Sequence, residues 1–497
     1  RKFQGKADRY IDDGGHTGWV HSPISGKEIT AKQWLQIITN KKISADNHCH
    51  WKVVEGGFVE NSLLMFAEDF KAAVRKEPAE MLEMVMRNKE NVIPVYIDML
   101  YAGVAYSEDK FFEKIERNLL QQLFREFPCD LNDQRKLHFC EILSRAKKDQ
   151  WSEQVIKKLK QIMMFDNGED KEGKDTQEID SEGLLSRVLN TLKGRAIRTV
   201  GDLLWENKEL LPLFQKCIDQ CSLEEDAVVR MASLYALCPV YNIDREWAEQ
   251  RILHVYESDV RMARFPNSRE MLFRLFLKYK SRVLKVALKW FEAKEKYLVQ
   301  SGAYSICEFY VCHREFSYVI MDMKRLSEEQ VKYILHMAVI YLKYDEYRET
   351  SKNIILRYRN LDMNLEFPLA NIFYDNLVDV ERDSQFLILI MQSQVSRKVI
   401  FAFVRFLEEN ACSIKDYAEI IIALCENIIE VSQQEVEKQW GIEGELSKLI
   451  FALYDEVANS SDESDKKVAE KCLELWDMMF EKQIGQVREL SRQLMER

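Results

Sequence analysis

Four of the eight histidines lie within 35 residues near the N-terminus, and Cys49 stands between two of them: His16, His21, His48 and His50. Imidazole and thiolate groups are ligands that zinc prefers, so a zinc site is one hypothesis for this cluster. The spacing of these side chains matches no regular zinc motif. The alternative, which we favour, is that they are polar loop residues around Trp51, and we predict no metal site.

A row of basic residues is the second candidate site: Lys278, Lys280, Arg282, Lys285 and Lys289. Apolar residues, among them Val283 and Trp290, alternate with the cations at helical spacing. A cationic and partly aromatic surface could bind an acidic partner or a phosphate backbone. The alternative is an ordinary solvated face above a core-facing stripe. We assign the five basic residues as the candidate partner-binding site and leave that alternative open.

Motifs that carry catalysis are absent from the sequence. It contains no G-x-x-x-x-G-K-[ST] phosphate loop, no G-x-G-x-x-G, no G-x-S-x-G and no H-E-x-x-H. Its acidic pairs fall on solvated helix faces or in residues 166–183, where water would reach paired carboxylates. We therefore expect no catalytic residue and no cofactor in this chain.

The composition favours an all-helical fold. The chain has 497 residues, of which 46% are hydrophobic and 31% are charged, so it can bury a large core. It contains only 8 prolines and 17 glycines, and no glycine occurs from residue 303 to residue 440. A sheet-rich fold needs such residues at its turns, whereas long helices with short connections do not.

Charge, cysteines and hydropathy indicate the class of partner and the compartment. The net charge of −11 disfavours a general nucleic-acid-binding surface. The eleven cysteines are scattered, which is typical of buried, reduced thiols in a cytosolic protein. No signal peptide or membrane-spanning segment is visible, because the most apolar run, at 386–391, is far shorter than the ~20 residues that cross a bilayer. We expect a cytoplasmic protein.

The chain divides into four predicted regions. Residues 1–60 form an irregular segment with one helix, which starts at the capping box Thr30–Gln33. Residues 61–165 are helical and are punctuated by prolines at 78, 94 and 128. Residues 166–183 form an acidic flexible loop. Residues 184–497 form an α-solenoid of degenerate HEAT/TPR-like helical pairs.

Sequence signals within 184–497 support this repeat interpretation. Gly194 and Gly201 lie seven residues apart on one helical face, where small residues allow neighbouring helices to approach closely. Asp226 and Arg230 form an Asp-x-x-Val-Arg pattern, which could build a ladder of charge-assisted hydrogen bonds between repeats. Four further capping boxes are expected at Ser222–Glu225, Asn267–Glu270, Ser327–Gln330 and Ser432–Glu435.

Several phrases occur in an order that resembles the C-terminal region of large bacterial STAND NTPases, including the antiviral Avs group. They are Gly18–Ser25, Ile29–Leu35, Gly56–Gly57, Glu77–Pro78, Asn190–Leu204, Asp226–Arg230 and Lys280–Cys307. Two details depart from the family pattern. Gly194-Arg195 stands where Arg-Gly is usual, and Thr30–Gln33 replaces an acidic phrase.

The resemblance implies a function. In that family an N-terminal effector and a central ATPase precede a C-terminal helical-repeat sensor, which binds a phage portal or large terminase subunit. The ATPase then oligomerises and activates the effector. This chain, which opens at Arg1 without an initiator Met, would be the sensor alone, and ATP and Mg would bind only in the missing parent domain. The alternatives are a cytosolic scaffold for cellular proteins and a nucleic-acid-binding helical repeat.

Overall fold

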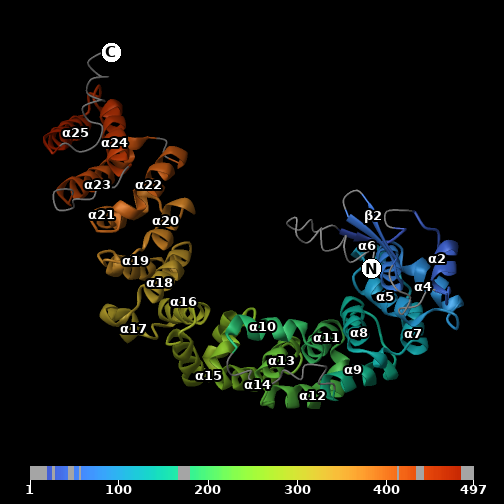
Figure 1. The fold of residues 1–497 in the computed structure, drawn as a ribbon. Coiled ribbons are helices and arrows are strands. Elements are labelled where there is room, and N and C mark those ends of the chain that lie inside the picture. The colour runs from blue at the N-terminus through green and yellow to red at the C-terminus, as the bar shows by residue number, and fades with distance from the viewer. Residues whose placement is uncertain are drawn as a thin grey trace, which may run out of the picture. The chain divides into compact units, whose positions relative to one another are not determined.

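The structure is a computed structural model that describes residues 19–24, 28–42, 50–54, 57–165, 179–410, 413–431 and 441–482. The chain forms two compact units, Arg1–Phe265 and Pro266–Arg497. Helices make up most of both units (Figure 1). Within the described ranges, no helix is both long and apolar enough to cross a membrane.

The first unit contains helices α2 to α14. Pro78 and Pro94 each stand at the first position of a helix, as the sequence predicts, because this position needs no backbone N–H donor. The bounds are α2 Ala31–Ile38, α3 Leu63–Lys76, α4 Pro78–Arg87, α5 Pro94–Ala105, α6 Asp109–Phe112, α7 Arg117–Glu126, α8 Asp133–Arg145, α9 Glu153–Phe165, α10 Ser181–Asn190, α11 Leu192–Glu206, α12 Leu211–Leu223, α13 Ala227–Val240 and α14 Arg245–Ser258. Short 3-10 helices lie at η1 Cys129–Leu131, η2 Lys208–Leu210 and η3 Val260–Arg264.

A small sheet in the first unit corrects the all-α prediction. Strand β3 (Gly57–Asn61) pairs in parallel with β1 (Trp19–His21) and antiparallel with β2 (His50–Val54). The predicted helix of this segment is present as α2, but the rest of the segment is not simply irregular. Its strands are rich in aromatic and β-branched residues, which favour extended structure. Three short strands with glycines between them left no periodic signal that distinguished them from a loop.

Helices of the first unit pack in order along the chain. Helices α3, α5, α8, α11 and α13 contact one another in sequence, and α9, α12 and α14 form a second series. Helix α10 begins at Ser181, so the last residues of the acidic segment 166–183 are helical. Helix α11 packs on α8 and α9, which precede that segment, as well as on α13, which follows it. The helices on both sides of the acidic segment therefore belong to one compact unit.

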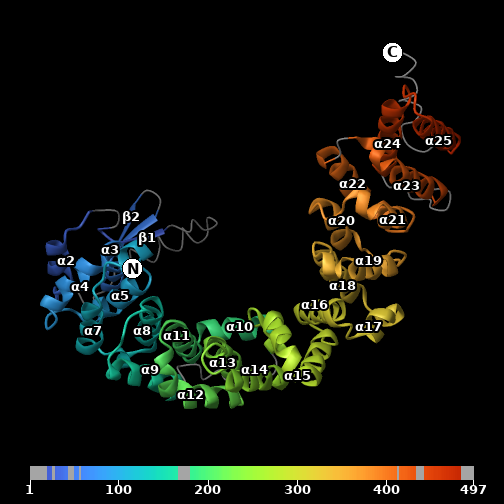
Figure 2. The same cartoon turned by 180° about the vertical axis from the view of Figure 1, so that it is seen from behind.

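The second unit contains helices α15 to α25. Alternate helices contact one another along two rows: α16, α18, α20, α22 and α24 form the first row, and α19, α21, α23 and α25 form the second. Figure 2 shows the two rows from behind. The bounds are α15 Ser268–Phe291, α16 Lys296–His313, α17 Ser317–Met321, η4 Met323–Arg325, α18 Glu328–Tyr341, α19 Asp345–Tyr358, α20 Glu366–Tyr374, α21 Val380–Met391, α22 Ser396–Asn410, η5 Ile414–Tyr417, α23 Ala418–Val431, α24 Ile442–Val457 and α25 Glu463–Glu481. These contacts between neighbouring helices are those of helical-repeat packing.

Helix capping follows the sequence prediction at two positions and departs from it at two others. The capping boxes at Thr30 and Ser327 are both formed. The box predicted at Ser222 is wrong, because Ser222 lies inside α12 and its hydroxyl donates to the carbonyl oxygen of Asp219. Asn267 precedes α15 in a left-handed conformation and makes no side-chain cap. The box predicted at Ser432 lies outside the described residues.

Arg–carboxylate ion pairs join neighbouring helices in both units. They connect α5 with α8, α8 with α11, α15 with α16 and α19 with α21. The pairs are Asp98–Arg135 at 2.6 Å, Glu141–Arg195 at 2.7 Å, Glu308–Arg269 at 3.0 Å, and Asp383–Arg348. Charge-assisted hydrogen bonds of this kind fix both the distance and the orientation of two helices.

Candidate protein-binding groove

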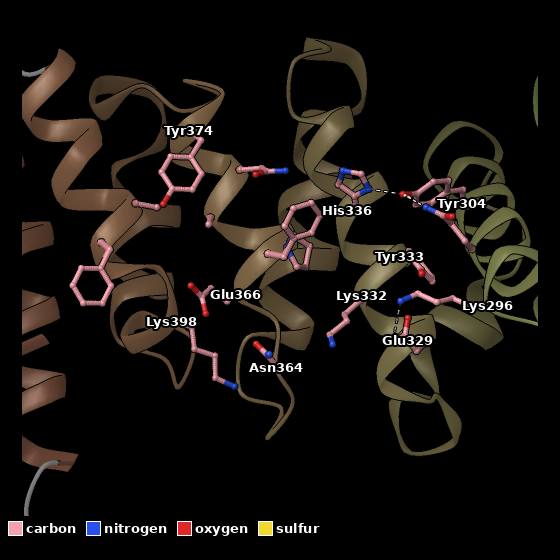
Figure 3. A pocket seen from close by; sticks show the side chains of 17 residues that line it. Lys296, Tyr304, Glu329, Lys332, Tyr333, His336, Asn364, Glu366, Tyr374 and Lys398 are labelled. Carbon is pink, nitrogen blue, oxygen red and sulfur yellow. Dashed lines mark hydrogen bonds and ion pairs between the residues drawn. The ribbon is translucent and has the colours of Figure 1, made fainter. Parts of the chain in front are cut away.

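A groove of about 700 Å³ crosses four successive helices of the second unit, α16, α18, α20 and α22 (Figure 3). Each helix contributes polar and aromatic side chains from its solvent-facing side. The lining residues are Lys296, Gln300, Tyr304, Glu329, Lys332, Tyr333, His336, Asn364, Glu366, Phe367, Pro368, Ala370, Asn371, Tyr374, Lys398, Phe401 and Ala402.

Helical periodicity directs these side chains into the groove. In α16, Lys296, Gln300 and Tyr304 recur every four residues and therefore share one face. Leu298 and Ile306 on other faces of the same helix are buried. Because the buried faces anchor each helix in the core, the groove is a fixed property of the repeat packing.

Exposed aromatic rings form much of the groove surface. Phe367 is 72% exposed, Tyr374 is 52% exposed, and Phe401 is 46% exposed. Tyr304 and Tyr333 lie edge to face, with ring centroids 5.7 Å apart. Large rings lose little conformational entropy on binding and are typical anchors of protein interfaces.

A hydrogen-bonded chain holds two of the groove residues in place. The amide of Gln300 donates to the Tyr304 hydroxyl at 3.1 Å, and that hydroxyl lies 2.5 Å from Nδ1 of His336. Burial lowers the pKa of His336 and raises the pKa of Tyr304, so both side chains are neutral near pH 7. The three side chains of this hydrogen-bonded chain on α16 and α18 are therefore polar, uncharged and held in place.

Charged residues lie along one side of the groove, whereas Tyr304, His336 and Tyr374 lie along the other (Figure 3). Nζ of Lys296 lies 3.9 Å from Glu329, and Lys332 pairs with Glu328 at 2.7 Å. Lys398 donates to the carbonyl oxygen of Met363. The two ion pairs offset the charges of Lys296 and Lys332, whereas a carbonyl oxygen leaves the charge of Lys398 in place, so the groove offers a partner exposed rings beside a few charges. The arrangement suits noncovalent binding of a protein segment.

The five predicted partner-binding residues, Lys278, Lys280, Arg282, Lys285 and Lys289, all lie on α15, outside the lining of the groove. They do not form a single helical row, because the backbone of Tyr279 is non-helical (φ −123°, ψ 35°) and breaks α15 into two halves. Lys278 therefore precedes the break, and the other four residues follow it.

The two halves of α15 contact α16 in opposite directions. Before the break, Phe273 stacks on Phe309, with ring centroids 5.6 Å apart. After the break, Lys280 pairs with Glu315 at 2.5 Å, and Phe291 at the helix end packs against Gly302. The sequence pattern did not indicate this break, because both halves of α15 keep an apolar stripe.

The predicted structural residues lie on α11 and α13. A Cβ at Gly201 would lie 2.3 Å from the carbonyl oxygen of Tyr235 in α13, so this glycine permits a close helix approach. A Cβ at Gly194 would lie nearest to the carbonyl oxygen of Val188, in the adjoining helix α10. Arg195 pairs with Glu141 of α8.

Asp226 and Arg230 do not form the ladder between repeats that the sequence suggested. The carboxylate of Asp226 accepts a hydrogen bond from the backbone N–H of Val228 and caps α13. Nη1 of Arg230 donates to the carbonyl oxygens of Glu224 and Glu225 at 2.6 and 2.7 Å. Both side chains therefore stabilise the start of one helix, and the ion pairs between repeats involve other residues.

The predicted histidine and cysteine cluster cannot be placed as a site. His16, His48 and Cys49 lie outside the described residues, and His21 and His50 are described only as backbone positions in β1 and β2. In the part of the chain that the structure describes, no group of three His, Cys, Asp or Glu side chains could hold a metal ion.

Sequence reasoning missed the groove. Phe309 and Tyr358 are buried in the core, whereas Tyr333, from the same aromatic-rich part of the sequence, lines the groove. A signal was present in α20, where Phe367, Asn371 and Tyr374 share one helical face. Assigning that face to solvent required knowing which neighbouring helices cover the others.

A smaller pocket of about 400 Å³ lies in the first unit. The buried rings of Tyr101 and Phe139 form part of its wall, and the charged groups of its lining are already paired, Lys158 with Asp130 and Arg125 with Glu126. It offers fewer exposed rings than the groove does.

Compared with protein-family models and with curated proteins, the sequence matches none.

Proposed function

We propose that this chain is a protein-recognition module and that the groove across α16, α18, α20 and α22 is its binding surface. The observation that carries the proposal is the set of exposed rings that successive repeats contribute to one groove: Phe367, Tyr374 and Phe401. A preformed surface of this kind needs little reordering when it binds, so its rings can act as anchors.

The resemblance described above supports a finer proposal, in which the chain is the sensor of an antiviral STAND NTPase. Its partner is then a phage structural protein, either the portal or the large terminase subunit. ATP and Mg act in the parent ATPase, whose oligomerisation activates a separate effector in the cytoplasm. For this coupling, the phage protein must bind the active state of the parent more tightly than the resting state.

Co-purification tests the finer proposal. Residues 1–497 carrying an affinity tag are co-expressed with individual phage portal proteins, large terminase subunits and major capsid proteins. We expect retention of a portal or of a large terminase subunit, and no retention of the capsid proteins, which serve as controls. Retention of none of these proteins would contradict the sensor proposal and leave the scaffold alternative.

A further inference from the structure

We propose that the second half of α15, residues 280–291, is a separate interaction surface that binds an acidic surface of a partner protein. The chain has a net charge of −11, yet residues 266–360 contain 18 Lys or Arg and only 11 Asp or Glu. Helix α15 alone contains seven basic residues and one acidic residue. A local positive field of this kind attracts acidic partners.

Packing fixes the direction of the basic residues. Arg282, Lys285 and Lys289 are three and four residues apart and therefore share one side of the helix. Val283, Ala287 and Phe291 on the opposite side are buried in the core. The cations are thus held outward by the buried side of their own helix.

Two of these cations form no ion pair with an acidic residue in the part of the chain that the structure describes. Within the described residues, Glu315 pairs with Lys280 and Glu308 pairs with Arg269. Lys285 and Lys289 are exposed and form no ion pair with a described residue. Their charge is therefore available to a partner.

Apolar side chains beside the cations favour a protein over a nucleic acid. Leu284 and Leu288 directly precede Lys285 and Lys289 and are only half-buried. Protein interfaces combine an apolar centre with a charged rim, and leucine side chains at this place could supply such a centre. A phosphate backbone would use the lysines and leave the leucines without a contact.

The surface is distinct from the groove. None of Leu284, Lys285, Leu288 and Lys289 is among the groove-lining residues. The groove is aromatic and nearly neutral, whereas this surface is cationic. The inference therefore goes beyond the proposed function and can fail or hold independently of it.

Charge reversal tests the inference. The full chain is titrated with a labelled peptide that contains several glutamates and two leucines, and separately with a labelled short DNA duplex, by fluorescence anisotropy at low and moderate salt. We expect K285E/K289E to weaken peptide binding about tenfold, since two exposed charge contacts contribute up to about 1 kcal/mol each. The control K466E/K467E changes two exposed lysines of α25 and alters the net charge equally. Its affinity for the peptide should match that of the unchanged chain.

Two results would overturn the proposal. One is equal peptide affinity for K285E/K289E and for the unchanged chain, both folded by circular dichroism. The other is tighter binding of the DNA duplex than of the peptide, with a loss of DNA binding in K285E/K289E. That second result would assign the surface to nucleic acid.

Discussion

Asp383 joins α21 to α19 through buried ion pairs. Its carboxylate is fully buried and pairs with Arg348 and, at 2.8 Å, with Lys352. The backbone N–H of Asp379 also donates to it. Burial alone would raise the pKa of Asp383, but these hydrogen bonds hold it below its usual value. Because every charge in the cluster has a partner, the buried polar groups are tolerated.

We predict that Asp383→Ala lowers the free energy of unfolding by about 3–5 kcal/mol, because it removes the carboxylate that pairs with the buried Arg348 and leaves Lys352 paired with Glu349 alone. Asp345→Ala is the matched control, since the Asp345 side chain is 86% exposed and its pair with Arg382 is solvated. Chemical unfolding followed by circular dichroism measures both variants. Similar stability of the two variants would contradict this account of the cluster.

The same cluster predicts a loss of stability in acid. A carboxyl group whose pKa is lower in the folded chain stabilises the fold above its unfolded pKa, near 4. That contribution is lost as the pH falls through the folded pKa, because the proton uncouples Asp383 from Arg348 and Lys352. The free energy of unfolding of Asp383→Ala should therefore lack this part of the decrease at acidic pH.

At the scale of elements, close helix contacts depend on glycines at particular positions. Gly201 lies against the backbone of α13, and Gly302 lies against the end of α15. A side chain at either position would force apart helices that are neighbours in the fold. Small residues at such contacts allow neighbouring repeats to pack closely against each other.

Gly201→Ala should destabilise the chain by about 1–3 kcal/mol, since the added Cβ would lie within 2.3 Å of the Tyr235 carbonyl oxygen. Gly444→Ala is the control, because a Cβ there meets no atom within 4 Å. In that helical position alanine should leave stability unchanged or raise it by up to about 1 kcal/mol. Thermal unfolding of the two variants measures the difference, and an equal effect would count against the close approach.

The sequence predicted individual elements better than the contacts between them. Pro78, Pro94 and two capping boxes placed helix starts correctly, because these signals act within a few residues. The break at Tyr279 was not predicted, since no Gly or Pro marks it. The three strands were missed because each is short, and because β1 pairs with β3, which lies far from it in the sequence.

At the scale of the whole molecule, repeat packing was predictable but the binding surface was not. Periodic apolar residues and the scarcity of Gly and Pro indicate stacked helices. The candidate site depends on which faces remain uncovered once α16, α18, α20 and α22 stand side by side. The basic residues predicted on α15 do mark an excess of positive charge. The groove, in contrast, could be recognised only from the three-dimensional structure.

The groove makes the account testable, because its rings are exposed before binding. Phe367 and Phe401 contribute little to the buried core, so replacing them should leave the fold intact. Rings that anchor a partner are worth about 2 kcal/mol or more each at an interface. Leu473 of α25 offers a matched control, since it is apolar and 50% exposed but lies outside the groove.

The most direct measurement is the affinity of F367A/F401A for the phage protein that co-purifies with the chain, by isothermal titration calorimetry. We predict that its dissociation constant rises at least about thirtyfold, whereas L473A binds as the unchanged chain does. Equal affinities of F367A/F401A and the unchanged chain would show that the partner binds elsewhere and would contradict the central claim.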